Sequence, residues 1–382
     1  MKTHYDVIVL GGGIAGVAAA LASARNGADT CLIEKEYCLG GLATLGLIVV
    51  YLPLDDGQGE MMSGGLAEEL LKLSAKEEPE LIPELWRNDH RAEERKGRRY
   101  QVTYNAADMM IRMEKLLTEN GVALFYDLRL AGARARNGRI TAVTVDSKRG
   151  PVEMTADAFV DATGDADLAF FAGEPVAEYD RNSRTGWYFS MDGEKRVKLH
   201  KLTDDFYHVT DDMPHYNGLD PEDISRHMQD MHSFIAQHAA KQDPPVKPFM
   251  IPAFHGLRTT RRLDTARPFD ANRDEGTWCE DCIGMIGNWR EPRGRYALPY
   301  SILHGVENDN LFMAGRCVSA IGDGWDLARV IPSGAVTGQA AGTAAAMTAK
   351  GQASPEIAAL QKKLAEQGVL LRPELFDRKE QA

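Results

Sequence analysis

The chain has 382 residues, 44% of them hydrophobic, and a formal net charge of −12. This length allows a large buried core and predicts two or three structural units. The acidic balance argues against a nucleic acid or an anionic membrane as the main partner, so neither is expected.

The start of the chain and its cysteines bear on the compartment. The first ten residues lead straight into a predicted strand, which leaves no room for a signal or transit peptide. The apolar stretch from Leu39 to Leu54 is too short to span a bilayer, and glycines interrupt it. Five cysteines with scattered spacing fit a reducing compartment. We therefore expect a cytoplasmic protein.

The stretch from Tyr5 to Gly41 places a glycine cluster between two predicted strands. Residues 7–10 form a short apolar run without helical period, which predicts a buried parallel strand. An Ala-rich helix follows over residues 18–25, and a second strand over residues 30–33 ends on Glu34. This order of elements is that of a dinucleotide-binding β-α-β unit.

Three glycines in this unit stand at G-x-G-x-x-G spacing. Gly11 permits the tight turn, Gly13 lets a pyrophosphate approach the backbone, and Gly16 lets helix and strand pack closely. The helix N-terminus offers N–H groups and a partial positive charge to the phosphates. Glu34 lies where a carboxylate accepts hydrogen bonds from ribose hydroxyls, which favours NAD or FAD over NADP.

The residues that follow separate these two cofactors. Glu34-Lys35, Leu39-Gly40-Gly41 and Ala43-Thr44 resemble the start of the FAD-dependent oxidoreductases of the glutathione-reductase structural type, in which a Gly-Gly pair leads toward the flavin. The resemblance implies that the cofactor is FAD. The cofactor contacts expected from this part of the chain are Gly11, Gly13, Ile14, Ala15, Gly16, Glu34, Lys35, Gly40, Gly41, Ala43 and Thr44.

A hairpin is predicted around Asn137-Gly138, between strands at 129–135 and 139–146. A further strand at 156–160 reaches the turn Ala162-Thr163-Gly164-Asp165. This segment is similar to the small β-meander of the same flavoproteins, in which such a turn lies against the dinucleotide. The resemblance adds the contacts Leu130, Ala162, Thr163 and Gly164. Amphipathic helices are predicted near 66–75, 105–120 and 355–367, and we expect the last to pack on the FAD-binding domain.

The composition changes between residues 175 and 299, where aromatic residues, His, Met and Asp increase and prolines interrupt the chain. We expect an inserted substrate domain here, with a β-like part at 187–209 and a helix at 221–240. His227 and His238 fall near one face of that helix but lack a carboxylate cluster at metal spacing, so no metal is expected.

Two segments leave alternatives open. Cys279 and Cys282 form a C-x-x-C motif, which can be a redox pair or half of a zinc site. No second such motif accompanies it, so a connecting segment with two small residues is favoured. Residues 87–99 are a mixed charge run typical of a solvated loop; the alternative is a loop that covers the active site and meets an anionic substrate.

Arg258, Arg261 and Arg262 stand close enough to bind carboxylates or phosphates, or to form interdomain ion pairs. Their segment resembles the R-x-x-R-R stretch of flavoproteins related to succinate dehydrogenase and fumarate reductase, in which an arginine commonly faces the flavin cavity. With Arg329 they are predicted to hold an anionic group of the substrate. His255 is predicted to transfer a proton, since imidazole titrates near neutral pH.

Residues 310–349 combine a strand that ends near Gly315 with a helix of small residues at 333–349. A transmembrane pair is disfavoured because the helix lacks apolar bulk. The segment closely resembles the closing signature of the same family, in which the helix N-terminus points at the flavin ring and stabilises charge on the reduced flavin. Arg316 stands where related flavoproteins often carry an acid. The resemblance adds the contacts Gly315, Arg316, Ile331, Ser333, Gly334 and Ala335.

These expectations combine into an α/β fold, in which a Rossmann-like, doubly wound FAD-binding domain (1–174 and 300–382) is interrupted by a mixed β/α substrate domain (175–299). The expected activity is hydride transfer between flavin N5 and a small organic, anionic substrate, with an external electron donor or acceptor. The alternatives are a flavin-dependent monooxygenase or oxidase, a tRNA-modifying flavoprotein, and a flavin-binding protein without catalysis. The sequence is compatible with an oligomer.

Overall fold

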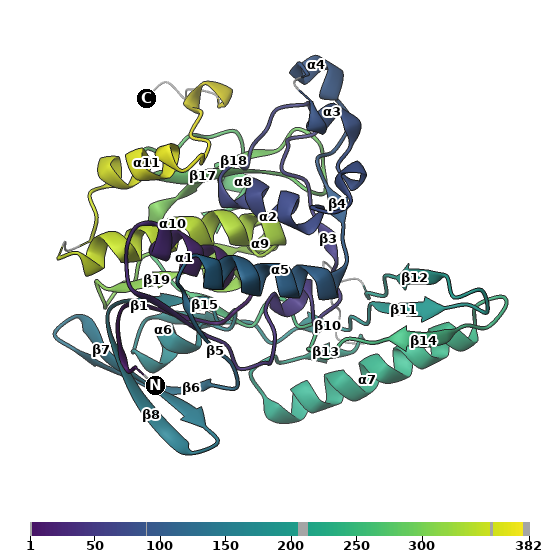
Figure 1. Cartoon of the computed structure of the whole chain (residues 1–382), viewed down its shortest axis with the longest axis horizontal. Coiled ribbons are helices and arrows are strands. Elements are labelled where there is room, and N and C mark those ends of the chain that lie inside the picture. Colours follow the sequence, from purple (N-terminus) through teal and green to yellow (C-terminus); the bar gives the residue numbers. More distant parts are fainter. Residues whose placement is uncertain (1, 89, 205–212, 352–353, 377–382) are drawn as a thin grey trace.

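A computed structural model describes residues 2–88, 90–204, 213–351 and 354–376. Its central sheet has seven strands in the order β5-β2-β1-β8-β7-β6, with β19 also paired to β8 (Figure 1). The strands of this sheet are β1 (His4–Leu10), β2 (Thr30–Ile33), β5 (Ala123–Phe125), β6 (Arg129–Arg136), β7 (Arg139–Ser147), β8 (Gly150–Asp161) and β19 (Leu311–Met313). The parallel core of this sheet confirms the predicted Rossmann-like α/β fold.

Strand β8 serves two parts of the sheet. Its first residues pair with β7 in antiparallel fashion, which completes the predicted meander beyond the Asn137-Gly138 turn. Its later residues, from Thr155 to Asp161, run parallel to β1 and end beside Leu10. Strand β19 lies on the other side of β8, also parallel. Strands from the two ends of the chain therefore finish at one edge of the sheet.

Two helices with small side chains pack directly against each other. They are α1 (Ile14–Arg25) and α10 (Ile331–Ala349), and both are buried along most of their length. A Cβ atom on Gly338 would lie 2.2 Å from the carbonyl oxygen of Ala15, and one on Gly342 would lie 2.0 Å from that of Ala19. The prediction that small residues let α10 approach neighbouring backbone is confirmed.

The predicted amphipathic helices are present as α2 (Leu66–Ser74), α5 (Ala106–Glu119) and α11 (Ile357–Glu366). Asn105 caps α5, because its side chain accepts hydrogen bonds from the N–H groups of Ala107 and Asp108. The tail helix α11 buries Leu360 and Leu364 in the same core as α1 and α10. No helix within the described part of the chain is long and apolar enough to cross a membrane.

The middle of the chain forms a separate small sheet with its own helix. Strands β12 (Val197–His200), β11 (Tyr188–Met191) and β14 (Lys247–Met250) lie in that order, and α7 (Pro221–Ala240) runs along them (Figure 1). The bounds of α7 agree with the predicted helix. The predicted β-like part ends in residues 205–209, which lie outside the described residues. The domain boundaries at 174 and 299 remain predictions.

The remaining elements are short. They are α3 (Glu84–Arg87), α4 (Ala92–Arg95), α6 (Asp167–Phe171), α8 (Ala271–Asp274) and α9 (Gly322–Ala328), and the strand pairs β3 (Val50–Tyr51) with β4 (Val102–Thr103), β9 (Val176–Glu178) with β15 (Arg261–Leu263), β10 (Asn182–Ser183) with β13 (His215–Tyr216), β16 (Phe269–Asp270) with β20 (Ala320–Ile321), and β17 (Cys282–Gly287) with β18 (Arg295–Pro299).

Candidate functional site

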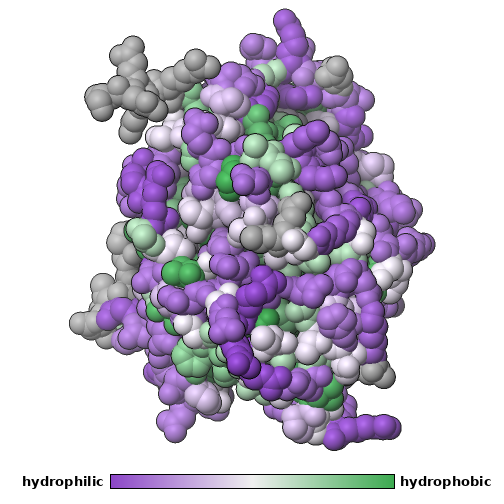
Figure 2. Space-filling model, turned by 90° about the vertical axis from the view of Figure 1, so that its left-hand side faces the viewer, coloured by the Kyte–Doolittle hydropathy of each residue, from purple (hydrophilic) through white to green (hydrophobic). Residues whose placement is uncertain are grey.

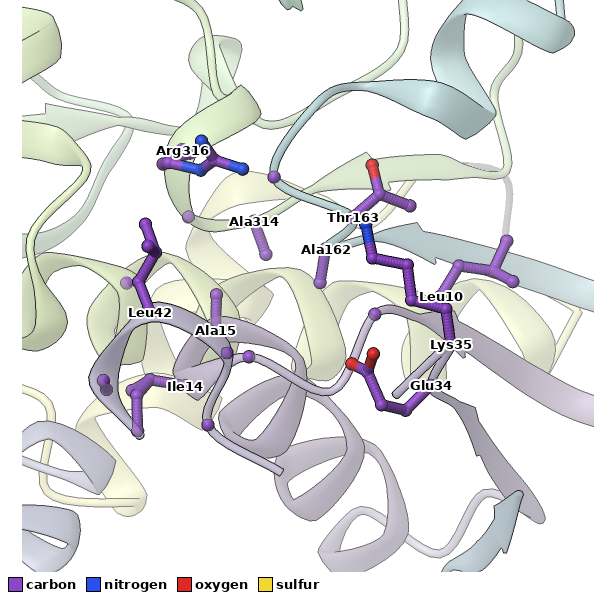
Figure 3. Close-up of a pocket in the computed structure, with 18 of the residues that line it drawn as sticks. Leu10, Ile14, Ala15, Glu34, Lys35, Leu42, Ala162, Thr163, Ala314 and Arg316 are labelled. Atoms are coloured by element: carbon purple, nitrogen blue, oxygen red, sulfur yellow. The ribbon is translucent and has the colours of Figure 1, made fainter. Parts of the chain in front are cut away.

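A cavity of about 1020 Å³, including its open mouth, lies where the parallel strands end (Figure 3). Leu10 and Ile33 bring the ends of β1 and β2 to it, and Ala162 and Ala314 follow β8 and β19. Ligands of open α/β sheets bind in this position, outside the carboxyl ends of the strands. We call it the dinucleotide cavity.

Most of the cofactor contacts expected from the sequence line this cavity. Those that do are Gly11, Gly13, Ile14, Ala15, Glu34, Lys35, Gly40, Gly41, Ala43, Leu130, Ala162, Thr163, Gly164, Gly315, Arg316, Ile331 and Gly334. Residues more than 270 positions apart in the sequence thus surround one space, and their individual contacts with a cofactor remain predictions.

Four of the expected contacts lie behind the cavity wall. A Cβ on Gly16 would lie 1.8 Å from the carbonyl oxygen of Gly11, so this glycine serves the helix–strand contact. The hydroxyl of Thr44 donates to the Leu39 carbonyl at 2.6 Å, and that of Ser333 donates to the Leu327 carbonyl at 2.7 Å. Ala335 is fully buried. These residues hold the wall in place from behind.

The cavity fits a dinucleotide at the phosphate end and at the ribose end. A Cβ on Gly13 would meet nothing within 4 Å, so the backbone there is open to a ligand. Neither α1 nor α10 has a side-chain N-cap, and both begin at the cavity, which leaves their first N–H groups for an anion. Glu34 lines the cavity as a buried carboxylate. Burial raises its pKa, and the hydrogen bonds from the backbone N–H groups of Glu36 and Gly12 act in the opposite direction.

Lys35 crosses part of the cavity. Figure 3 shows its side chain reaching from the end of β2 toward Thr163. Its ammonium group also lies 5.2 Å from the ring centre of Phe254, which lines the same cavity. Phe254 could not be found from the sequence, because this residue comes from the middle of the chain and stands in no recognisable motif.

Arg316 stands at the position where the resemblance led us to expect an acid. Its charge is engaged in an ion pair. Its guanidinium is buried and pairs with Asp165 at 2.9 Å, and it donates to the Leu257 carbonyl at 2.5 Å. The hydroxyl of Thr260 donates to the same Asp165 carboxylate at 2.6 Å. Burial raises the pKa of Asp165, but the nearby cations, Arg316 first among them, and the Thr260 hydrogen bond together outweigh burial, so the pKa is lowered. The pair fastens the segment 257–260 to the wall of the dinucleotide cavity.

A second cavity of about 810 Å³ adjoins the first. Arg329 lines both cavities, and Arg181 and Arg258 line only the second. Tyr179 and Trp325, packed edge to face at 6.3 Å, add an aromatic wall. We call it the arginine cavity, since three arginines from separate segments border it; Asp323 and Asp326 line it as well, and Asp326 pairs with Arg329.

Asn182 holds one side of the arginine cavity together. Its carbonyl oxygen accepts hydrogen bonds from the backbone N–H groups of Arg258 and Thr259 at 3.0 and 2.9 Å. Its amide group donates to the carbonyl oxygens of Thr259 and Tyr216. A single side chain therefore fixes the backbone that presents Arg258, a role that no motif in the sequence indicates.

The predicted catalytic residues separate into two groups. Arg258 and Arg329 line the arginine cavity, whereas Arg261 and Arg262 line neither cavity. Arg261 pairs with Asp167 at 2.8 Å and donates to the Asp165 carbonyl at 2.9 Å; Arg262 pairs with Asp264 at 2.9 Å. Both guanidinium groups are held by these acids, of which Asp167 itself lines the dinucleotide cavity. Arg261 and Arg262 therefore form ion pairs, which was the alternative to substrate binding.

His255 lies between residues that line the two cavities, but it lines neither itself. Burial lowers its pKa to about 3, so its ring is neutral near pH 7. The expectation of an imidazole that titrates near neutral pH is therefore wrong for this environment. Its Nδ1 atom is buried and has no hydrogen-bond partner.

The two open alternatives of the sequence analysis lie away from both cavities. Cys279 and Cys282 are free thiols in a turn, in which the Cys282 N–H donates to the Cys279 carbonyl at 3.1 Å. Among the described residues, no group of three or more His, Cys, Asp or Glu side chains is arranged to hold a metal ion. The described residues of the charged segment 87–99 line neither cavity.

Comparison with known proteins identifies the class that this geometry indicates. Residues 6–245 and 266–364 match a family model described as FAD dependent oxidoreductase. These ranges cover most of the chain, so the chain belongs to the FAD-dependent oxidoreductase family, and its cofactor is FAD. No curated protein matches the chain.

Among solved structures, one with a TM-score above 0.5 agrees with this fold. A structure of BexE, described in relation to oxidation during BE-7585A biosynthesis, has a TM-score of 0.51 at 12% identity and covers 95% of this chain. This chain spans 66% of the BexE chain. A geranylgeranyl bacteriochlorophyll reductase-like protein from Thermoplasma acidophilum has a TM-score of 0.48 at 15% identity, covering 96% of this chain and 84% of its own. At these identities the similarity concerns the fold alone.

Proposed function

We propose that this FAD-dependent oxidoreductase transfers a hydride between flavin N5 and a small anionic organic substrate held in the arginine cavity. The observation that carries the proposal is the position of Arg329, which borders both cavities. A ligand bound beside Arg329 in the second cavity therefore adjoins the space assigned to the cofactor. An external electron donor or acceptor completes the reaction.

The cofactor contacts follow from the walls of the dinucleotide cavity. The open backbone at Gly13 and the first turn of α1 would hold the diphosphate, and Glu34 would accept from the adenosine ribose. The uncapped start of α10, at Ile331 and Gly334, would face the flavin ring. When bound there, FAD supplies a two-electron hydride acceptor or donor. The N–H groups at the start of α10 would stabilise negative charge on that ring.

The arginine cavity supplies orientation and charge for the substrate. Arg258 is presented by backbone that Asn182 fixes, and guanidinium groups bind carboxylate or phosphate in a defined orientation. Tyr179 and Trp325 exclude water from the opposite wall. In the oxidative direction the substrate also loses a proton. His255, neutral near pH 7, has a ring nitrogen that can accept this proton, but its pKa of about 3 makes it a weak base, and it lines neither cavity.

The test is anaerobic photometry of the purified protein. We expect a yellow protein that releases FAD on heating and is bleached by small carboxylic or phosphorylated alcohols from a substrate panel. Arg258→Leu should weaken the apparent affinity for the active anion about 10- to 100-fold, the size of a lost charge-assisted hydrogen bond. Arg134→Leu, on the exposed surface of β6, is the matched control and should change nothing. Equal affinities in wild type and Arg258→Leu would contradict the proposal.

The same assay in air separates the reaction types. Slow reoxidation that an added electron acceptor accelerates supports a dehydrogenase or reductase. Rapid reoxidation with substrate-dependent oxygen uptake instead supports the monooxygenase or oxidase alternative.

A further inference from the structure

An arm built from the middle of the chain projects from the body. It consists of residues 187–201 and 241–251, which contain β11, β12 and β14, and it extends beside α7 (Figure 1). We call these residues the basic arm. One face of its sheet is covered by α7, because Tyr188 packs in a small core with Met231 and Ile235. The opposite face of this sheet is not covered by α7.

The uncovered face of the arm is apolar. Side chains alternate along a strand, so cross-strand partners point to the same side. Met191 pairs with Val197 of β12, and Phe189 pairs with Met250 of β14. Met191, Val197 and Met250 on this face are 40%, 53% and 43% exposed, whereas Phe189 and Leu199 on the same face pack partly against the main core. Contiguous exposed apolar residues of this kind mark an interaction surface.

The charge of the arm is opposite to that of the chain. Its residues include six lysines and arginines against two aspartates and one glutamate, although the chain carries a net charge of −12. Lys247 lies on the apolar face itself, paired with Met191. Figure 2 views the molecule from the side opposite the arm and shows a mostly hydrophilic surface with small apolar groups. The partner of the arm should therefore be acidic and should offer an apolar contact.

The chain itself carries such a surface. From the end of α2 to the first residue of α3, the exposed residues Glu77, Glu78, Glu80 and Glu84 flank Leu81 in the sequence; Leu81 is 37% exposed, and Glu77 also pairs with Arg112. This acidic segment matches the arm in both respects, since it has opposite charge and an apolar side chain at its centre. A lipid surface would satisfy the cations of the arm, but it would leave this match unexplained.

We propose that the basic arm is an interface between copies of this chain, in which the uncovered face of one arm packs on the acidic segment 77–84 of a second copy. Every copy carries both surfaces, so two copies can exchange the contact reciprocally, or several can close a ring. The wild-type protein is then larger than a monomer in solution, and high salt weakens the assembly. This inference is independent of the reaction proposed above.

The test is sedimentation velocity of the FAD-loaded full chain at micromolar concentration. We expect a wild-type assembly larger than a monomer and a monomer for Met191→Glu with Val197→Glu. Val306→Glu is the matched control, because Val306 is 50% exposed outside the arm. It should leave the assembly intact. Flavin content and circular dichroism check that each variant is folded.

A charge exchange tests the partner surface. Glu77→Lys with Glu78→Lys and Glu80→Lys should dissociate the assembly, and adding Lys195→Glu and Lys247→Glu to the same chain should restore it. A monomeric wild type, or an assembly unchanged by the arm variants, would overturn the proposal. So would a monomer that binds vesicles of anionic phospholipid through the arm, because the occupant would then be a membrane.

Discussion

The two cavities are built in different ways. The dinucleotide cavity depends on backbone conformation: Gly11 has a φ of +100° and Gly315 a φ of +76°, which favour glycine, and the helix starts are uncapped. The arginine cavity depends on long side chains held by distant partners, as Asn182 holds the backbone of Arg258 and Thr259. Backbone requirements restrict the residue type at a position and leave a pattern in the sequence. Long-range side-chain contacts leave none.

The largest expected effect separates two glycines of one turn. Gly16→Ala should cost about 3 kcal/mol or more in unfolding free energy, because its Cβ would lie 1.8 Å from the Gly11 carbonyl oxygen. Gly13→Ala should leave stability within about 0.5 kcal/mol of wild type, since its Cβ points into open space. The Cβ of that variant should instead lower FAD affinity. Urea denaturation and flavin fluorescence titration measure the two effects.

A result in which both variants lose the same stability would contradict this division. It would mean that Gly13, like Gly16, serves packing and that the dinucleotide cavity is less open than the structure shows. Equal FAD affinity of wild type and Gly13→Ala would remove the diphosphate from this turn.

A second prediction concerns the acid sensitivity of the middle region. His227 of α7 is fully buried, neither ring nitrogen has a hydrogen-bond partner, and burial lowers its pKa to about 4 from 6.5. The unfolded chain therefore binds a proton between pH 6.5 and 4 that the folded chain does not bind. Stability from this group is present above pH 6.5 and falls as the pH drops, by about 3 kcal/mol at pH 4.

His227→Leu should remove this component, so the difference in unfolding free energy between variant and wild type should grow as the pH falls from 6.5 to 4. His232→Leu, at an exposed position of the same helix, is the control and should keep the wild-type pH dependence. The measurement is urea denaturation at a series of pH values. A difference that is independent of pH would show that His227 is protonated in the folded protein.

The sequence was sufficient for much of the dinucleotide cavity. Strand β2 was predicted with the bounds that the structure has, and the glycine turn, the Ala162-Thr163-Gly164 turn and the start of α10 all meet at one space. The middle region was different. Helix α7 was predicted with the bounds that the structure has, yet Phe254, Asn182 and the aromatic wall at Tyr179 and Trp325 could not be placed. Each of these acts through a contact with residues far away in the sequence, which no local pattern encodes.

The arginines at 258–262 also show that a local sequence pattern does not encode long-range contacts. Arg258 and Arg261 are three positions apart, but the first lies in an irregular segment and the second in β15. Arg261 stacks on Phe170, at 4.2 Å from the ring centre, and pairs with Asp167. Burial raises the pKa of Asp167 to about 6, and the Arg261 guanidinium opposes that rise. The sequence alone does not distinguish Arg258 from Arg261. In the structure, Arg258 lines the arginine cavity, whereas Arg261 is held in an ion pair by Asp167.

The smallest expected effect tests this difference. Arg261→Leu should cost about 1–2 kcal/mol in unfolding free energy, because it removes one ion pair and a bond to the Asp165 carbonyl; the Asp167 side chain is 36% exposed, so water replaces part of the loss. Its affinity for the substrate anion should equal that of wild type, while Arg258→Leu weakens it at little cost in stability. Urea denaturation and anaerobic titration measure both quantities. A loss of anion affinity in Arg261→Leu beyond that of Arg258→Leu would place the anion at β15, and the boundary between structural and substrate-binding arginines would have to be moved.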